Sequence, residues 1–503
     1  MGEPADARVA RREARAAEIL EEVVEGLALA EGRDEQALVL SRSALWDAQR
    51  ADLREAQIRW HAQAAGILRR RGERQAAIAG YEQAASLLDE LRSARAGGEG
   101  QRAPADPTWP RVYEALADLL LERAASAPGS EQAERDLRAA QRTMERFKLS
   151  ELRDYFRDDC VDAWRQKLAD PARASASAAV IYPIVLPDRL ELLVSDATGI
   201  RRFATPIGAE RVDAEARRLR RLLVKRTTRE YLIPARTLYD WLIRPLHSYL
   251  EQLGADTLVF VPGGSLRIIP MAVLHDGEHF LIERFAVAVT PGLELTDPGP
   301  IDREGFLLFA GGLSEAREGF APLPHVTEEI SALHERYGGQ QLLDESFVRE
   351  DIGDTLHERE FTAVHVATHA QFGSTPDDTF LLTWDGRLSL HELAEYVGAF
   401  RFRDTPLDLI LLSACETAAG DEQAALGLAG VAVRAGARSA VGTLWSVNDE
   451  ASATLVLAFY EELARPGVSR ARALQRAQQR VMSEPRYRHP AYWSPFLLIS
   501  SWL

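Results

Sequence analysis

The sequence predicts a multidomain protein in which an all-α N-terminal region precedes an α/β domain with a mostly parallel sheet, covered by helices on both faces. Up to about residue 168, Ala, Glu, Arg, Leu and Gln dominate, and apolar residues recur three and four positions apart, as in amphipathic helices. After residue 178, short apolar runs alternate with helical patterns. Strands that are apolar on both faces and separated by helices favour a parallel sheet buried between helical layers.

The composition restricts the class of protein. A chain of 503 residues corresponds to about three or four domains, and its 46% hydrophobic and 27% charged residues favour packed cores over disorder. The 60 Lys and Arg residues face 76 Asp and Glu residues, which leaves a formal charge of −16. Because such a chain repels phosphates, we expect neither direct nucleic-acid binding nor attachment to an anionic membrane.

The N-terminal region contains one helical pair with small residues at its interface. In residues 60–88, Gly72 marks a turn between two helical patterns, and the second pattern carries Ala77, Tyr81 and Ala84. Small residues allow two helices to approach closely, and this spacing resembles the second half of a tetratricopeptide repeat.

A second helical pair is expected at residues 109–123 and 131–147, because a single repeat cannot bury its own apolar face. An ordinary helical bundle remains the alternative. Polar segments rich in Gly, Pro or Ser at 93–110 and 169–178 read as loops, and a third such segment lies at 296–305. We therefore expect a helical interaction domain at 1–172 and two α/β parts at 178–297 and 303–503.

The α/β region is expected to contain seven strands and several helices. The strands are predicted at 180–186, 190–194, 257–262, 306–309, 363–368, 407–412 and 440–444, and the helices at 209–223, 231–253, 326–336, 390–396, 426–435, 451–465 and 470–482. The stretches beginning at Asp256 and Asp408 each present an acid, a buried strand and a turn of small residues. This similarity hints at a duplication in which only the second copy carries a thiol.

Cysteine usage and the N-terminus indicate the compartment. Only Cys160 and Cys415 occur, which excludes a disulfide-stapled scaffold and a four-thiolate zinc site. The first residues are charged throughout and lack the apolar run of a signal peptide, and no stretch of about 18 uncharged apolar residues follows. We expect a cytoplasmic protein.

Two strand ends carry the residues that favour catalysis. The run 363–370 leaves its strand at His369, and the run 407–416 leaves its strand at Cys415. In a parallel sheet, functional groups collect beyond the carboxyl ends of the strands. If the two strands are neighbours, the imidazole and the thiol face each other across a crevice.

A Cys–His pair at this position would suit nucleophilic catalysis. A free thiol has a pKa of about 8.5, so it needs a nearby imidazole to form thiolate at neutral pH. The backbone N–H groups of Cys415 and Ala370, both on tight turns, are candidates for the oxyanion hole. The alternative is that Cys415 only fills a buried strand as a small apolar residue.

The other thiol and imidazole are expected to be structural. His365 lies mid-strand and is expected to be a hydrogen-bonded core residue. It is unsuited to share a zinc ion with His369, because strand residues four apart lie ~13 Å from each other. Cys160 is expected to be a packing residue, and the sequence predicts no metal site.

Eight segments of the sequence resemble the signature blocks of the CHAT family, which contains caspase-like and separase-like cysteine peptidases often fused to tetratricopeptide repeats. The resemblance spans about 150 to 503, and its blocks occur in the family's order. They are ELRDYFRDDC at 151–160, LYDWLIRPL at 238–246, LVFVPGGSLRIIPMAVLHDG at 258–277, VHVATHAQF at 364–372, LTWDGRLSLHEL at 382–393, LLSACETAAGDE at 411–422, AVRAGARSAVGTLWSVNDEAS at 432–452 and HPAYWSPFLL at 489–498.

The resemblance implies roles for individual residues. His369 matches the family's catalytic histidine and Cys415 its nucleophile, and Ala370 takes the next position, whose N–H helps to form the oxyanion hole. The part at 180–295 then resembles an inactive caspase-like half. The expected activity is cysteine-type endopeptidase without metal or organic cofactor.

The segment 444–450 is similar to a block that shapes the substrate pocket in separase-like relatives. It contains Trp445, Asp449 and Glu450, and an acid there would select a basic side chain before the cleaved bond. The alternative is structural: Ser446 and Asp449 fit a capping box for the helix from residue 451, and Trp445 then fills the core. Residues 373–379 are either a gate to the site or an ordinary surface loop.

The resulting hypothesis is an endopeptidase that cleaves a protein substrate, possesses a Cys–His dyad and is regulated by a protein activator through its helical N-terminal domain. The resemblance also suggests a role in bacterial defence or cell death. One alternative is a catalytically silent scaffold that binds protein partners. A nucleotide-binding domain is disfavoured, because the glycines at 427–430 lack both the P-loop lysine and the GxGxxG spacing. The oligomeric state and the substrate are not predicted.

Overall fold

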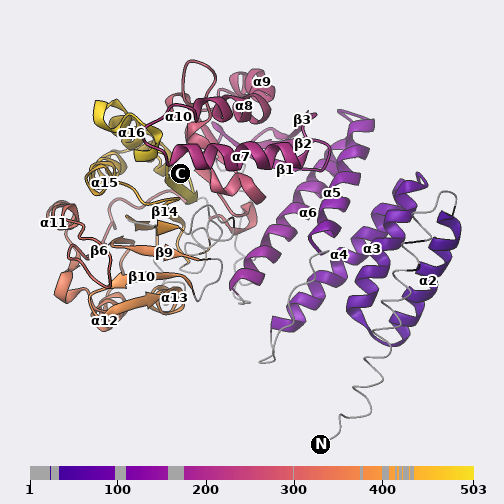
Figure 1. Ribbon diagram of the computed structural model, residues 1–503, viewed down its shortest axis with the longest axis horizontal. Coiled ribbons are helices and arrows are strands. Elements are labelled where there is room, and N and C mark those ends of the chain that lie inside the picture. Colours follow the sequence, from indigo (N-terminus) through magenta and orange to yellow (C-terminus); the bar gives the residue numbers. More distant parts are fainter. Residues whose placement is uncertain are drawn as a thin grey trace, which may run out of the picture. The chain divides into compact units, whose positions relative to one another are not determined.

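The computed structural model describes residues 33–96, 109–156, 175–297, 299–373, 378–398, 407–413 and 436–503, with positions 23, 26, 416, 417, 422 and 430. The chain forms two compact units, residues 1–150 and 151–503 (Figure 1). The predicted end of the helical domain, at residue 172, falls in the segment 157–174, outside the described residues. Both predicted α/β parts belong to the second unit.

The first unit consists of consecutive helices. The described helices are α2 (Asp34–Arg50), α3 (Arg54–Arg70), α4 (Arg74–Ala96), α5 (Trp109–Ser126) and α6 (Glu131–Phe156). Neighbours in sequence from α2 to α5 pack on one another, which confirms the first expected helical pair. The helices of the second expected pair, α5 and α6, are both present, and Arg123 of α5 donates a hydrogen bond to Asp136 of α6. The helix α4 continues to Ala96, past the predicted loop start at residue 93.

Small residues hold α3 against α4, as the repeat pattern predicts. Gly72 forms the turn with a φ of +79°, where a side chain would be strained. Ala77 and Ala84 are fully buried. A Cβ on Gly80 would lie 2.9 Å from the Cβ of Ala65, so the close approach of the helices depends on this glycine.

The second unit is built on one large, mostly parallel sheet. Its strand order is β3-β2-β1-β4-β5-β15-β14-β12-β8-β6-β7. Among the described strands of this sheet, the antiparallel pairings are β1 with β2, β2 with β3 and β14 with β15. The strands are β1 (Ala178–Val185), β2 (Leu190–Asp196), β3 (Gly199–Thr205), β4 (Thr257–Phe260), β5 (Ala286–Val289), β6 (Leu308–Gly312), β7 (Gln340–Leu343), β8 (Ala363–Ala367), β12 (Leu409–Leu412), β14 (Ser439–Thr443) and β15 (Phe496–Ser500).

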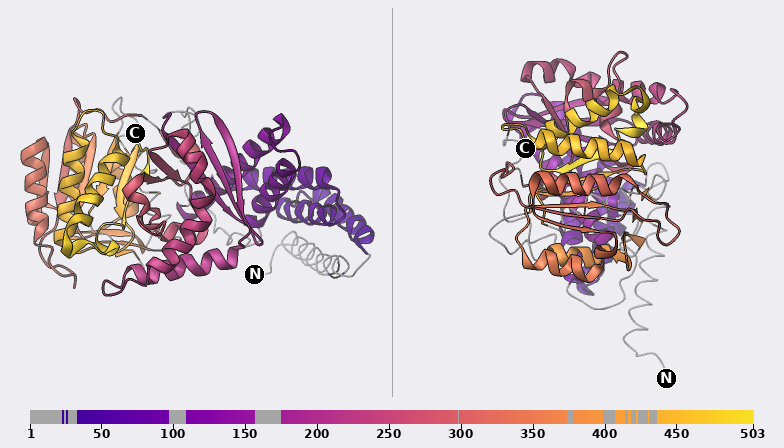
Figure 2. Two further views of the ribbon diagram at one scale, coloured as in Figure 1. Left: turned by 90° about the horizontal axis from the view of Figure 1, so that it is seen from above. Right: turned by 90° about the vertical axis from the view of Figure 1, so that its left-hand side faces the viewer.

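Helices cover the sheet on both faces, which confirms the predicted fold class. The helices α11, α15 and α16 pack side by side over one face of the second half of the sheet, and α12 and α13 lie on the other face (Figure 2). The helices are α7 (Ala209–Leu223), α8 (Leu232–Leu242), α9 (His247–Leu253), α10 (Leu281–Arg284), α11 (His325–Tyr337), α12 (Arg349–Glu358), α13 (Leu390–Gly398), α15 (Asp449–Leu463) and α16 (Arg470–Ser483).

A second, four-stranded sheet lies in the crossover between β8 and β12. Its order is β11-β10-β9-β13, formed by β9 (Ala370–Phe372), β10 (Phe380–Thr383), β11 (Gly386–Ser389) and β13 (Glu416–Thr417). The sequence predicted only the helix at 390–396 in this crossover. Strands this short carry too few residues for a period-two pattern to stand out.

One other sequence expectation needs correction, and one is not tested. The helix predicted at 231–253 is interrupted around Pro245 and forms α8 and α9, because a proline in a helix removes a hydrogen bond and clashes with the preceding turn. The helix predicted at 426–435 lies almost wholly outside the described residues. No helix in the described part of the chain has the length and apolarity to cross a membrane.

Buried charges tie the amino ends of the central strands to α16. Asp408, directly before β12, is paired with Arg470 at 3.2 Å and with Arg438 at 2.9 Å. Arg470 is fully buried and also donates to the carbonyl groups of Gly299 and Leu503. One arginine therefore joins a strand, the segment between the two halves and the last residue of the sequence.

Candidate active site

The two predicted strand ends lie side by side. The parallel strands β8 and β12 are neighbours, with Leu412 in register with Val366. Just beyond them, the Ser413 N–H donates to the Val366 carbonyl at 2.8 Å. In the small sheet, β13 runs parallel to β9 with Glu416 opposite Gln371. The expected adjacency of the two strands is thus confirmed.

His369 stands between these two points of contact, at the carboxyl end of β8. Cys415 and the preceding residue lie outside the described residues, so the structure does not test the predicted thiol–imidazole contact. In the sequence, Cys415 stands between Ser413 and Glu416, whose backbone partners precede and follow His369.

The imidazole of His369 is half-buried and is held by a loop at residues 313–324, which joins β6 to α11. Its Nε2 lies 2.8 Å from the carbonyl oxygen of Ala321. The ring also lies against the Phe320 ring, with centroids 4.9 Å apart. Because a carbonyl only accepts, this contact requires the proton on Nε2, which leaves Nδ1 of the neutral ring with a lone pair that can accept a proton.

Contacts to the small sheet hold this loop in place. The guanidinium of Arg317 lies 3.4 Å from the centroid of the Trp384 ring, and Glu318 is paired with Arg387 at 2.9 Å. The turn also needs positive φ at Glu318 and Gly319, which are +46° and +85°. This loop was not predicted from the sequence, although it follows the Gly-Gly end of β6, a strand adjacent to β8.

Ala370, the predicted oxyanion donor, is buried and begins β9. It is in register with Leu381 of β10, and the neighbouring His369 carbonyl accepts from the Leu382 N–H at 2.8 Å. The backbone of this residue is therefore held by its neighbouring strand immediately beside the imidazole.

Asp449 begins α15 and lies in the electrostatic neighbourhood of His369. Burial raises the pKa of its carboxyl group, while the His325 N–H, which donates to Oδ2 at 2.8 Å, and the imidazoles of His325 and His369 act in the opposite direction. The N-cap of α15 is Asn448, whose side chain accepts from the Ala451 N–H. The predicted capping box starting at Ser446 is therefore wrong by two residues.

Glu450 and Trp445 are engaged elsewhere. The Glu450 carboxylate lies 2.6 Å from the Arg486 guanidinium, and hydrogen bonds from Tyr487 and Arg486 lower its pKa. Trp445 is buried and donates through Nε1 to the Ala491 carbonyl at 3.1 Å. The Arg220 guanidinium lies 4.5 Å above the indole, and burial lowers the pKa of Arg220 to about 10. These contacts favour the structural alternative for both residues.

The remaining histidine of the strand behaves as a core residue. His365 is fully buried, with Nε2 2.8 Å from the Glu329 carboxylate and its ring edge-on to Tyr460. Among the described residues, no group of three or more His, Cys, Asp or Glu side chains could hold a metal ion. Cys160 lies outside the described residues.

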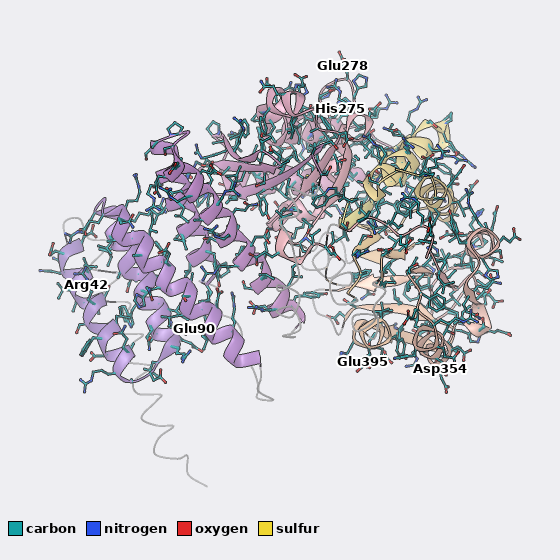
Figure 3. All side chains as sticks on the ribbon, turned by 180° about the vertical axis from the view of Figure 1, so that it is seen from behind. Arg42, Glu90, His275, Glu278, Asp354 and Glu395 are labelled. Atoms are coloured by element: carbon teal, nitrogen blue, oxygen red, sulfur yellow. The ribbon has the colours of Figure 1, made fainter. Side chains whose placement is uncertain are left out.

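The corresponding end of β4, in the first half, carries different chemistry. It is followed by Gly263, Gly264 and Ser265, and the buried Ser265 hydroxyl donates to Asp213 at 2.6 Å. His275, labelled in Figure 3, accepts the Gly277 N–H through Nδ1 and packs edge-on against Phe280. This histidine therefore supports a turn of the first half.

Residues 232–501 match the family model of the CHAT domain. The match covers more than half of the chain. The chain belongs to the CHAT domain family. The expected resemblance is confirmed, and the CHAT match covers part of the first half and nearly all of the second.

The chain is also similar to individual proteins. The human protein "Tetratricopeptide repeat protein 28" is 25% identical over 328 residues, which are 53% of this chain and 13% of that protein. The separase of a separase–securin complex from Saccharomyces cerevisiae has a TM-score of 0.48 at 10% identity, over 85% of this chain and 37% of that chain. The Arg-specific cysteine proteinase gingipain R has a TM-score of 0.36 at 9% identity, over 66% and 79% of the two chains. The chain thus spans a minor part of the first two proteins.

Proposed function

We propose that this CHAT protein is a cysteine endopeptidase in which Cys415 is the nucleophile and His369 its base. The observation that carries the proposal is the register of the strands, which brings the backbone on either side of Cys415 to the backbone on either side of His369. Nucleophilic catalysis by a thiol requires an imidazole within hydrogen-bond reach, and this register of the flanking backbone supports such an arrangement.

In the proposed mechanism, Nδ1 of His369 removes the proton from the Cys415 thiol. The thiolate attacks the scissile carbonyl, and the imidazolium then protonates the departing amine. A water molecule, deprotonated by the same nitrogen, hydrolyses the thioester and restores the thiol. The Ala321 carbonyl stabilises the imidazolium through Nε2–H, and the N–H groups of Ala370 and Cys415 are proposed to bind the oxyanion.

The test is covalent labelling with a Cys-directed peptidyl electrophile followed by intact mass measurement. The wild-type protein should gain one adduct, while Cys415→Ala and His369→Ala should gain none. Cys160→Ala is the control for labelling at the other thiol and should react as the wild type does. Wild-type protein that is not labelled, while folded, would favour the silent-scaffold alternative.

For specificity, we propose cleavage after Arg or Lys, with the Asp449 carboxylate selecting the basic side chain. The half-buried position of Asp449 near His369 supports this role. In this proposal Trp445 and Glu450 do not contact the selected side chain, because the indole is packed in the core and Glu450 is paired with Arg486.

A peptide library with varied residues before the cleaved bond tests the specificity. Asp449→Asn should abolish the preference for Arg and Lys while preserving the shape of the side chain. Glu450→Gln is the matched control and should retain the preference. An unchanged profile for Asp449→Asn would contradict the assignment of that acid.

We propose that the protein substrate or an activating protein binds the helical unit. Helical repeats present extended surfaces suited to protein partners, and the similarity to a tetratricopeptide repeat protein supports this role.

A further inference from the structure

Helix α6 contributes residues to both compact units. It runs without interruption from Glu131 to Phe156, while the units divide between Ser150 and Glu151. Its last turns therefore belong to the α/β unit, although they precede the CHAT match by more than 70 residues. Two residues in these last turns, Glu151 and Tyr155, contact segments that lie near strand ends of that unit.

Tyr155, near the end of α6, is bonded to the segment that follows β9. The tyrosine is buried, and its hydroxyl donates to the Gly373 carbonyl at 3.0 Å and lies 3.4 Å from the Thr379 hydroxyl. The Gly373 N–H in turn donates to the Thr379 hydroxyl at 3.1 Å. Both backbone polar groups of Gly373 are thus fixed by this pair of hydroxyl groups.

Gly373 suits this position because two parts of the chain meet there. A Cβ at Gly373 would lie 2.3 Å from the Cβ of Asp378, a distance that real Cβ atoms do not reach. The glycine therefore allows the chain to come back on itself directly after β9, where Tyr155 and Thr379 hold it.

One turn before Tyr155, Glu151 binds the first half of the sheet. Its carboxylate accepts two hydrogen bonds from the Arg267 guanidinium, one of them at 3.0 Å. Arg267 lies in the turn Gly264–Ile268, at the carboxyl end of β4. The last turns of α6 thus contact both halves of the α/β unit, each near a strand end.

The three residues of β9 connect Tyr155 to the proposed dyad. The strand begins at Ala370, beside His369, and ends at Phe372, beside Gly373. Its Gln371 is in register with Glu416, the residue that follows Cys415. A shift of Gly373 would therefore move the backbone that adjoins both proposed catalytic residues.

We propose that Tyr155 is a positioning residue for the Cys415–His369 dyad and acts through Gly373 and β9. The contacts of Tyr155 and Glu151 both lie within the α/β unit, so this role does not depend on the helical unit. The inference rests on the proposed peptidase function.

The experiment compares Tyr155→Phe with Tyr249→Phe in the full-length protein. Each change removes one tyrosine hydroxyl that is hydrogen-bonded within the α/β unit, and the Tyr249 hydroxyl donates to Asp196. Labelling of Cys415 by the peptidyl electrophile gives the maximal rate and the half-saturating concentration. Hydrogen–deuterium exchange of residues 370–373 and 378–383 gives a second readout that does not require activity.

In Tyr155→Phe, the maximal labelling rate should fall on the order of fivefold, the factor expected for one net hydrogen bond, with the half-saturating concentration unchanged. Exchange should accelerate in both segments. Tyr249→Phe should change neither readout. Glu151→Gln should also lower the maximal rate, since it removes the charge that Arg267 binds.

Failure of the inference and failure of the proposed function give different results. A labelled wild type with an unchanged rate in Tyr155→Phe would overturn the positioning role and leave the peptidase intact. An unlabelled wild type would overturn the peptidase function. In that event, faster hydrogen–deuterium exchange in Tyr155→Phe, but not in Tyr249→Phe, would still show that the Tyr155 hydroxyl fixes β9. Unchanged exchange in Tyr155→Phe would contradict that role.

Discussion

The two halves of the α/β unit share an arrangement at the start of a central strand and differ at its end. Asp256 precedes β4 and Asp408 precedes β12, and each is paired with an arginine from the first turn of α16, Arg472 and Arg470 respectively. At the other end, β4 is followed by glycines and a Ser265–Asp213 hydrogen bond. The strands of the second half are instead followed by His369 and, in sequence, by Cys415.

The acid–arginine pairs, which support the sheet, are similar in the two halves, whereas the residues proposed for catalysis occur in the second half. The similar acid–arginine pairs fit the duplication suggested by the sequence, because in both halves an arginine of α16 binds the acid that precedes a central strand. The carboxyl ends of the strands differ, and in α/β sheets these ends are where functional groups collect. The first half therefore supports the second without a Cys–His pair of its own.

The largest expected effect concerns the two strand ends. His369→Ala should lower kcat/KM for a peptide substrate by about 10²–10⁴-fold, the usual contribution of a general acid–base group. Ser265→Ala at the first strand end should leave kcat/KM unchanged. Steady-state kinetics on both variants checks this, and a comparable loss in Ser265→Ala would mean that the first half takes part in catalysis.

The second prediction compares the two arginines of α16. Arg470 and Asp408 are almost completely buried, so Arg470→Met should destabilise the protein by about 3–5 kcal/mol, as expected when a buried charge loses its partner. Arg472 and Asp256 are partly exposed, with side-chain exposures of 28% and 47%. Arg472→Met should therefore cost about 0–1 kcal/mol.

Denaturant unfolding of the α/β unit measures both free energies of unfolding. Equal losses in the two variants would show that the acid–arginine pairs of the two halves are equivalent. A negligible loss in Arg470→Met would mean that Arg438 alone is able to neutralise Asp408.

The smallest expected effect is the pH dependence at two neighbouring acids. The pKa of Asp449 is raised by burial, so its ionisation destabilises the folded state as the pH rises from the ordinary value of 3.8 through the raised one. Asp449→Asn should lose less stability than the wild type over that range. The pKa of Glu450 is lowered, chiefly by Tyr487, so Glu450→Gln should remove stability that is present above pH 4.5 and disappears on acidification.

Thermal unfolding between pH 3 and 7 distinguishes the two acids. The difference in Tm between wild type and variant should have opposite signs for Asp449→Asn and Glu450→Gln at neutral pH. Differences of the same sign would show that the two carboxyl groups have similar surroundings.

Much of the fold could be predicted from local patterns. The helix at 209–223 has the predicted bounds, and the strands around Val259, Val366 and Leu411 lie where continuous apolar runs placed them. The candidate site was predictable in part, because His369 and Cys415 each follow such a run. The loop that contacts His369 was not predicted, because the sequence around Phe320 and Ala321 shows no helical or strand pattern. These two residues lie near the imidazole because β6, which precedes the loop, is the neighbour of β8 in the sheet.

The sequence by itself determined the longer helices and the most apolar strands, because burial of one face or two imposes a pattern on the residues. It also determined that a histidine and a cysteine each follow an apolar run. Only the tertiary structure decided that β8 lies beside β12, that Glu450 is paired with Arg486 and Asp449 with the His325 N–H, and that Tyr155 reaches Gly373. A periodic pattern reports that a side chain is buried, whereas the identity of its neighbour depends on how distant segments pack.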